Sequence, residues 1–234
     1  MSVLARRAAA EFVGTAFLVM AVVGSGAMAS RLSPDDAGLQ LLQNSLATGA
    51  ALVALIVALQ PVSASFNPVV TLVERALGMI DTRTAAGLIG GQVLGGLTGT
   101  VAANLMFGLD AVAFSTRERT GAGLWLGEVL ATVGLLLVIF GTVRSGRADR
   151  VAFAVAGYIT AAYWFTSSTS FANPAVTIAR TVTDTFAGIA PPSAPAFILA
   201  QLLGGAAGYV LVRFLYPSFT DAPAALAADR KVLS

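Results

Sequence analysis

Long apolar stretches, separated by short polar connections, cover most of the chain. A helix needs about 20 predominantly apolar residues to cross the hydrocarbon core of a bilayer, and most of these stretches are close to that length. The fifth is the shortest of six predicted spans, which lie at about 8–29, 41–60, 84–107, 122–143, 149–167 and 195–216. The pattern therefore predicts an all-α membrane protein with six transmembrane helices.

The basic residues predict which ends of these helices face the cytoplasm. If the N-terminus lies inside, the inner segments carry ten of them: Arg6, Arg7, Arg75, Arg83, Arg144, Arg147, Arg150, Arg213, Arg230 and Lys231. The outer segments then carry four, Arg31, Arg117, Arg119 and Arg180. Because cytoplasmic loops are enriched in Lys and Arg, we expect a multi-pass protein of the cell (inner) membrane with both termini in the cytoplasm.

The two halves of the chain repeat each other. Three pairs of segments match in the same order, at offsets between 106 and 117 residues. They are Glu11-to-Thr15 with Glu128-to-Thr132, Asn67-Pro68 with Asn173-Pro174, and Gln92-to-Gly96 with Gln201-to-Gly205. Each half holds three spans, an odd number, so the second half inserts upside down, an arrangement that places a solute site near the bilayer midplane. We predict one channel domain over residues 1–234, with repeats at about 8–107 and 122–216.

Glycines recur in the matching segments. Gly95 and Gly99 in the first half, and Gly204 and Gly208 in the second, have the small-xxx-small spacing that lets two helix backbones approach closely. We interpret these glycines as helix-packing positions and not as part of a site.

Composition excludes several classes of protein. Charged residues make up 11% of the chain and hydrophobic residues 56%, too few charges for a soluble fold or a disordered chain. The net charge is +2 and the basic residues are scattered, so nucleic acid is not an expected partner. The chain has no Cys and no His, which removes disulfides and the usual zinc and haem ligands. With no nucleophile–base constellation either, we expect no enzyme, no metal and no cofactor.

Asn67-Pro68-Val69 and Asn173-Pro174-Ala175 each precede an apolar run that is too short to cross a membrane. Asn is a favoured N-cap and Pro fits the first helical position, so each segment predicts a re-entrant half-helix. In an inverted repeat the two half-helix N-termini meet at the midplane, where irregular backbone is tolerated beside a watery cavity. Two Asn NH₂ groups and two positive dipole ends then converge on one point, which admits neutral hydrogen-bonding solutes and opposes cations.

With its paired Asn-Pro segments, its six spans and the equivalent Glu11 and Glu128, the chain resembles the major intrinsic protein family, the aquaporins and aquaglyceroporins, over about residues 8–216. The resemblance implies the aquaporin fold, with two re-entrant half-helices in an inverted repeat, and a homotetramer with one pore per subunit in the lipid bilayer. It also implies that both glutamates brace loop backbone. Buried carboxylates alternatively suggest a proton-coupled secondary transporter, but their equivalent placement favours bracing.

The chain departs from the family in its selectivity filter. Val69 stands where the family usually has Ala, and Val176 stands where an arginine usually follows the second motif. The resemblance places the other filter positions at Thr48, Ala161 and Ser170. We expect a wider mouth without fixed charge, passing water and larger neutral solutes such as glycerol, urea and arsenous acid, as in bacterial aquaglyceroporins associated with arsenic. A water-selective pore is the alternative.

Arg180 lies four residues after Val176, on the same helical face one turn outward. It therefore has two interpretations. It either reaches the outer vestibule and partly replaces the missing charge, or it anchors the end of the half-helix in lipid headgroups, as Arg75 would at the end of the other. We favour the headgroup anchor.

Overall fold

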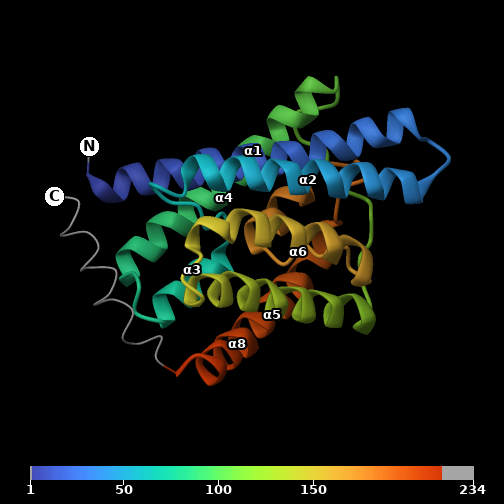
Figure 1. The fold of residues 1–234 in the computed structure, drawn as a ribbon. Coiled ribbons are helices and arrows are strands. Elements are labelled where there is room, and N and C mark those ends of the chain that lie inside the picture. The colour runs from blue at the N-terminus through green and yellow to red at the C-terminus, as the bar shows by residue number, and fades with distance from the viewer. Residues whose placement is uncertain (1, 218–234) are drawn as a thin grey trace.

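The computed structural model describes residues 2–217, and helices dominate this part of the chain (Figure 1). The long helices are α1 (Val3–Leu32), α2 (Ala37–Leu59), α4 (Thr82–Met106), α5 (Ala122–Arg144), α6 (Val151–Phe165) and α8 (Ala194–Leu215). Two short helices, α3 (Pro68–Ala76) and α7 (Pro174–Ala179), begin at the two Asn-Pro motifs. The structure thus has the predicted all-α fold of long helices and two half-helices.

Five helices are long and apolar enough to cross a membrane within the described part of the chain, where the sequence pattern predicted six. The exception is α6, which has 15 residues and at 1.5 Å per residue measures about 22 Å. A 3₁₀ turn at Ala148–Arg150 precedes it, and the chain leaves the helix at Thr166 to form the loop before α7. Although short, α6 packs against α2 and α5, so it still lies inside the bundle.

Helix packing follows the predicted repeat. In the first half α1 packs against α2 and α4, and in the second half α5 packs against α6 and α8. The two halves meet where α2 packs against α6. Each half-helix contacts a long helix of its own half and one of the other half, since α3 packs on α4 and α8 while α7 packs on α8 and α4. The half-helices therefore join the two repeats.

Glycines set the spacing between α1 and α4. A Cβ on Gly91, Gly95 or Gly99 would lie only 2.6, 2.2 or 2.1 Å from a backbone carbonyl oxygen of α1. The oxygens belong to Ala8, Phe12 and Ala16, so glycines and carbonyls both recur every four residues, which is one face of each helix. Because no side chain intervenes, the two backbones are in direct contact along this face.

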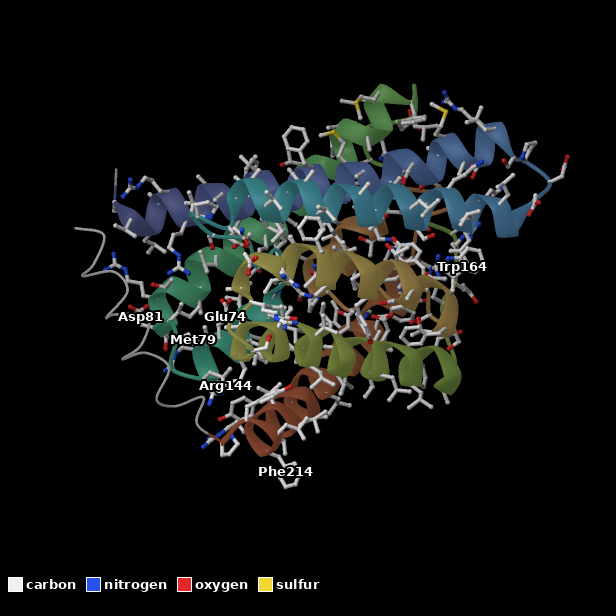
Figure 2. The ribbon with its side chains drawn as sticks, viewed as in Figure 1. Glu74, Met79, Asp81, Arg144, Trp164 and Phe214 are labelled. Carbon is white, nitrogen blue, oxygen red and sulfur yellow. The ribbon has the colours of Figure 1, made fainter. Side chains whose placement is uncertain are left out.

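The outer surface of the bundle is apolar. Phe214 is 81% exposed, and Figure 2 shows its ring pointing away from α8. Other exposed large side chains on the long helices include Phe17, Leu130, Phe153 and Val210. Continuous exposed apolar surface on this scale marks contact with lipid or with other subunits.

Candidate functional site

The two Asn side chains cap the half-helices and also cross-link the repeats. The Asn67 Oδ1 atom accepts a hydrogen bond from the backbone N–H of Val69 (2.9 Å), and the Asn173 Oδ1 atom accepts from Ala175 (3.0 Å). The Asn67 Nδ2 atom donates to the carbonyl of Ala172 (2.7 Å), and the Asn173 Nδ2 atom donates to that of Phe66 (2.7 Å). The sequence predicted that the NH₂ group of each asparagine serves as a donor at the pore, but one N–H of each group is instead used across the repeat. The other remains for a solute.

Those carbonyls belong to residues with unusual backbone. Phe66 has φ 48° and Ala172 has φ 47°, in the left-handed region, although neither is glycine. Such residues cost of order 1–3 kcal/mol each and persist only where surrounding contacts hold them. Each of these left-handed residues comes immediately before the asparagine that caps a half-helix. The sequence gives no sign of this backbone conformation, because neither residue is a glycine.

Glu11 and Glu128 supply contacts that hold these residues. Glu11 accepts hydrogen bonds from the backbone N–H groups of Ser65 (2.8 Å) and Phe66 (2.7 Å). Glu128 accepts from those of Phe171 (2.9 Å) and Ala172 (2.8 Å). Both carboxyl side chains are fully buried, and neither lines the cavity described below.

A glutamine completes each glutamate cluster. The Gln92 Nε2 atom donates to Glu11 (2.7 Å) and to the Thr71 hydroxyl on α3 (2.9 Å). Likewise the Gln201 Nε2 atom donates to Glu128 (2.6 Å) and to the Thr177 hydroxyl on α7 (2.8 Å). Sequence reasoning noted both glutamines as repeat markers but missed their role. The sequence offered one signal of this role, which is that the two glutamines occupy equivalent positions in the two repeats.

A cavity of about 350 Å³ runs past both asparagines. Its walls are mostly apolar and come from one stripe on each of four long helices. On α2 and α6 the lining positions recur every four residues, which is one helical face. They are Thr48, Leu52 and Ile56 on α2, continued by its C-cap residue Gln60, and Val151, Val155, Ile159 and Tyr163 on α6. Leu18 and Val22 of α1, and Leu135, Ile139 and Val143 of α5, are the apolar lining residues of the other two long helices.

Three of the four predicted filter residues, Thr48, Ser170 and Val176, line this cavity. Ala161 does not, and its prediction was wrong: it is exposed on the opposite face of α6. Tyr163 lines the cavity where Ala161 was expected to. The lining positions on α6 recur every four residues, so the series continues from Ile159 to Tyr163. The Tyr163 hydroxyl shares a hydrogen bond with the Thr48 hydroxyl at 3.2 Å.

Four residues of the Asn-Pro motifs lie behind the cavity wall: Pro68, Val69, Pro174 and Ala175 are buried but do not line it. Val69 fills the space beside Gly205 of α8, where an added Cβ would lie 2.6 Å from the Val69 Cγ1 atom. The valine in the first motif therefore changes packing against α8 and does not narrow the pore directly.

Arg180 lies inside the protein, so its interpretation as a headgroup anchor was wrong. Its side chain is 3% exposed and lines the cavity. The guanidinium carbon lies 3.4 Å from the centre of the Phe171 ring, and the Nε atom donates to the Ala187 carbonyl. Arg75, in contrast, is exposed and donates to the Thr82 hydroxyl (2.8 Å). The expected mouth without charge is thereby corrected to one with a buried arginine.

Two more arginines surround this mouth from the connection between α4 and α5. The Arg119 guanidinium lies 5.0 Å from the centre of the Phe171 ring, and its Nε atom donates to the Gly188 carbonyl (3.0 Å). Arg117 lies over Phe186 at 5.2 Å. Burial, together with the nearby charge of Arg117, lowers the pKa of Arg119 to about 10. Arg119 is therefore still protonated at neutral pH, and the mouth is electropositive.

The opposite end of the cavity is lined by Arg7, Gln60, Ser65 and Glu74. The Ser65 hydroxyl lies 3.2 Å from both carboxylate oxygens of Glu74. Figure 2 shows Glu74 toward the end of the bundle that carries Asp81 and Arg144, and Trp164 at the other end. Within residues 2–217 no group of three or more Asp, Glu, His or Cys side chains could hold a metal ion.

Comparison with known proteins identifies related chains. Residues 1–155 and 143–233 match the family described as Major intrinsic protein. The aquaglyceroporin AqpS of Rhizobium meliloti (strain 1021) is 49% identical over 213 residues, 91% of each chain. The X-ray structure of the aquaglyceroporin from Plasmodium falciparum superimposes with a TM-score of 0.71 and 18% identity, covering 92% of this chain and 98% of that one. The last match shows the shared fold.

Proposed function

Because the chain belongs to the major intrinsic protein family, we propose that it is a passive channel for glycerol, other small neutral solutes and water. The observation that carries this proposal is the single cavity along which two inverted half-helices present Asn67 and Asn173. Each asparagine keeps one amide N–H for a solute, since its oxygen caps a helix and its other N–H crosses to the opposite repeat.

The chemistry of the wall suits a solute with both C–H and O–H groups. Leu, Ile and Val side chains line most of the cavity, so they contact carbon. Thr48, Tyr163 and Ser170, which also line the cavity, carry hydroxyl groups. A polyol can lay its carbons on the apolar stripes while its hydroxyl groups bond to these few polar positions. We assign the constriction to Asn67 and Asn173, and the outer filter to Thr48, Tyr163, Ser170 and Val176.

Proton coupling through Glu11 or Glu128 is not supported by the geometry of this cavity. Glu11 and Glu128 are fully occupied by loop N–H groups and glutamine amides, and neither lines the cavity. A carboxylate that released these bonds to bind a proton would also release the strained Phe66 or Ala172. Passive flux is therefore favoured over coupled flux.

We further propose arsenous acid as a solute. As a small neutral molecule with three hydroxyl groups, it presents to the pore much the same hydrogen-bonding surface as glycerol. The related AqpS is itself an aquaglyceroporin by name. We also place the protein in the inner membrane as a homotetramer with cytoplasmic termini, an arrangement supported by the basic residues of the inner loops and the apolar outer surface.

The proposal is tested with proteoliposomes exposed to a glycerol gradient and followed by light scattering. A channel for glycerol gives fast shrinkage and then fast re-swelling as glycerol enters. Fast shrinkage without re-swelling identifies a water-selective pore and overturns the proposal for polyols, and rates equal to those of empty liposomes overturn the channel itself. Uptake of arsenous acid into the same vesicles then tests the metalloid. Repeating both with an imposed pH gradient tests for coupling, which is expected to be absent.

A further inference from the structure

Arg180 has a counterpart in the first repeat. Asn67 and Asn173 are 106 residues apart, as are Thr71 and Thr177, and the same offset pairs Arg180 with Glu74. Both members of this last pair line the cavity, on opposite sides of the asparagines. The two repeats thus place an ionisable side chain at each end of the pore, a guanidinium at one end and a carboxyl group at the other.

The charge of Arg180 is directed at the cavity. Its Nε atom is used by the Ala187 carbonyl and its flat face lies on Phe171. Over residues 2–217 the Nη groups donate to no protein acceptor, and no carboxylate lies within ion-pair distance of the guanidinium. Arg119 stands on the same aromatic ring, so the nearest strong charge has the same sign. Donors of a buried arginine that the protein leaves unused remain available to whatever occupies the pore.

Another unpartnered polar atom lies on the same wall. The Ser170 hydroxyl is buried, lines the cavity and has no hydrogen-bond partner. Val176 lines the same cavity, at the position where an arginine would otherwise stand, and its side chain contributes no polar atom. The wall therefore combines the apolar side chain of Val176 with the free Nη donors of Arg180, which lies one helical turn outward.

We propose that Arg180 is the cation barrier of the outer filter, supplying from one turn further out the charge that position 176 lacks. The inference rests on the channel function proposed above and adds its ion selectivity. A guanidinium fixed in a low-dielectric wall repels a cation strongly, while a neutral polyol bonds to its free Nη groups. With valine at position 176, no guanidinium stands there to narrow the pore for the larger solute.

The test compares sodium and glycerol fluxes in proteoliposomes of phosphatidylcholine and phosphatidylglycerol. Arg180→Met removes the charge but keeps an apolar chain against Phe171, and is expected to raise sodium flux by about tenfold or more. Arg180→Lys keeps the charge and is expected to stay near the wild-type sodium flux. Adding Val176→Arg to Arg180→Met is expected to restore sodium exclusion while lowering glycerol flux.

Two control variants separate the barrier from a general loosening of the pore. Arg75→Met removes an exposed arginine from the other half-helix, away from the cavity, and is expected to change neither flux. Glu74→Gln replaces the carboxyl group at the equivalent position of the first repeat with a neutral amide. A cation barrier made by a positive charge predicts no rise in sodium flux in this variant.

The outcomes distinguish the inference from the channel function. If wild-type vesicles pass no glycerol, the channel proposal fails. If they pass glycerol and Arg180→Met excludes sodium as well as wild type does, the inference alone is overturned. Equal sodium leaks in Arg180→Met and Arg180→Lys also overturn it, because the contact with Ala187 and not the charge would then matter. Should Arg180→Met not yield folded protein by gel filtration, Arg180→Gln provides the neutral variant for the same comparison.

Discussion

The contact between α1 and α4 leads to a prediction that a single added methyl group can test. In Gly99→Ala the new Cβ would lie 2.1 Å from the Ala16 carbonyl oxygen and 2.9 Å from the carbonyl carbon. Ordinary contacts begin at 3.4 Å, so the two helices must separate there by about 1.3 Å. The obstructing atoms are backbone and cannot rotate away. The neighbouring contact at Gly95 would be opened by the same movement.

The magnitude follows from two opposing effects. Alanine favours a helix over glycine by about 1 kcal/mol, whereas an overpacked interface costs about 1–3 kcal/mol, to which the lost contacts along the separated helices add. We expect a net destabilisation of about 1–2 kcal/mol, which for a chain of this size corresponds to a melting temperature lower by about 2–8 °C.

Two further glycines provide matched controls for the same chemical change. Gly90 lies on the same helix, and a Cβ there would meet nothing within 4 Å, so Gly90→Ala is expected to melt at or above the wild-type temperature. Gly208 is the repeat counterpart of Gly99, but its Cβ would meet the Leu136 Cδ1 atom at 2.6 Å. Because a side-chain end can move, we expect Gly208→Ala to lose less than Gly99→Ala.

Thermal unfolding of the detergent-purified protein, followed by circular dichroism and checked by gel filtration, measures this order. The predicted order of melting temperatures is Gly90→Ala at or above wild type, then Gly208→Ala, then Gly99→Ala. A Gly99→Ala protein that melts at or above wild type would refute the argument that glycine sets the α1–α4 spacing. So would a Gly208→Ala protein less stable than Gly99→Ala.

Three other predictions concern the pore and its supports. Val176→Arg places a second guanidinium one turn from Arg180 and is expected to lower glycerol and arsenous acid permeability more than water permeability, by stopped-flow light scattering; unchanged glycerol flux would mean that Val176 is not at the constriction. Glu128→Gln loses bonds to charged oxygen worth about 1.5–3 kcal/mol each, so its melting temperature is expected to fall while that of the exposed Glu118→Gln does not. Asp81 caps α4, and hydrogen bonds from Thr84 hold the pKa of its carboxyl below the usual range. Because this stabilisation is present above the unfolded pKa and lost as the carboxylate protonates, Asp81→Ala is expected to melt lower than wild type at pH 7, with the difference shrinking as the pH falls below about 4.

The sequence alone determined the features that repeat along the chain. Apolar runs of bilayer length predicted the long helices to within a few residues at most ends, because such runs satisfy their backbone only as helices in lipid. The matched Asn67 and Asn173 predicted the half-helices, and the odd number of spans in each half predicted their inversion. The equivalent Glu11 and Glu128 indicated a bracing role, since a proton path would not need one carboxylate in each half.

Only the tertiary structure decided which residues face the pore. α6 is apolar on every side, so no polar stripe distinguishes its pore face from its outer face; counting from the motifs gave Ala161, whereas packing against α2 and α5 turns Tyr163 inward. The left-handed backbone of Phe66 and Ala172 could not be predicted from the sequence either. Neither residue is a glycine, and hydrogen bonds to glutamates far away in the chain hold this backbone in place. Arg180 shows the same limit. Its spacing placed it one turn beyond Val176, but only Phe171 and Ala187, brought beside it by the fold, bury its charge in the pore.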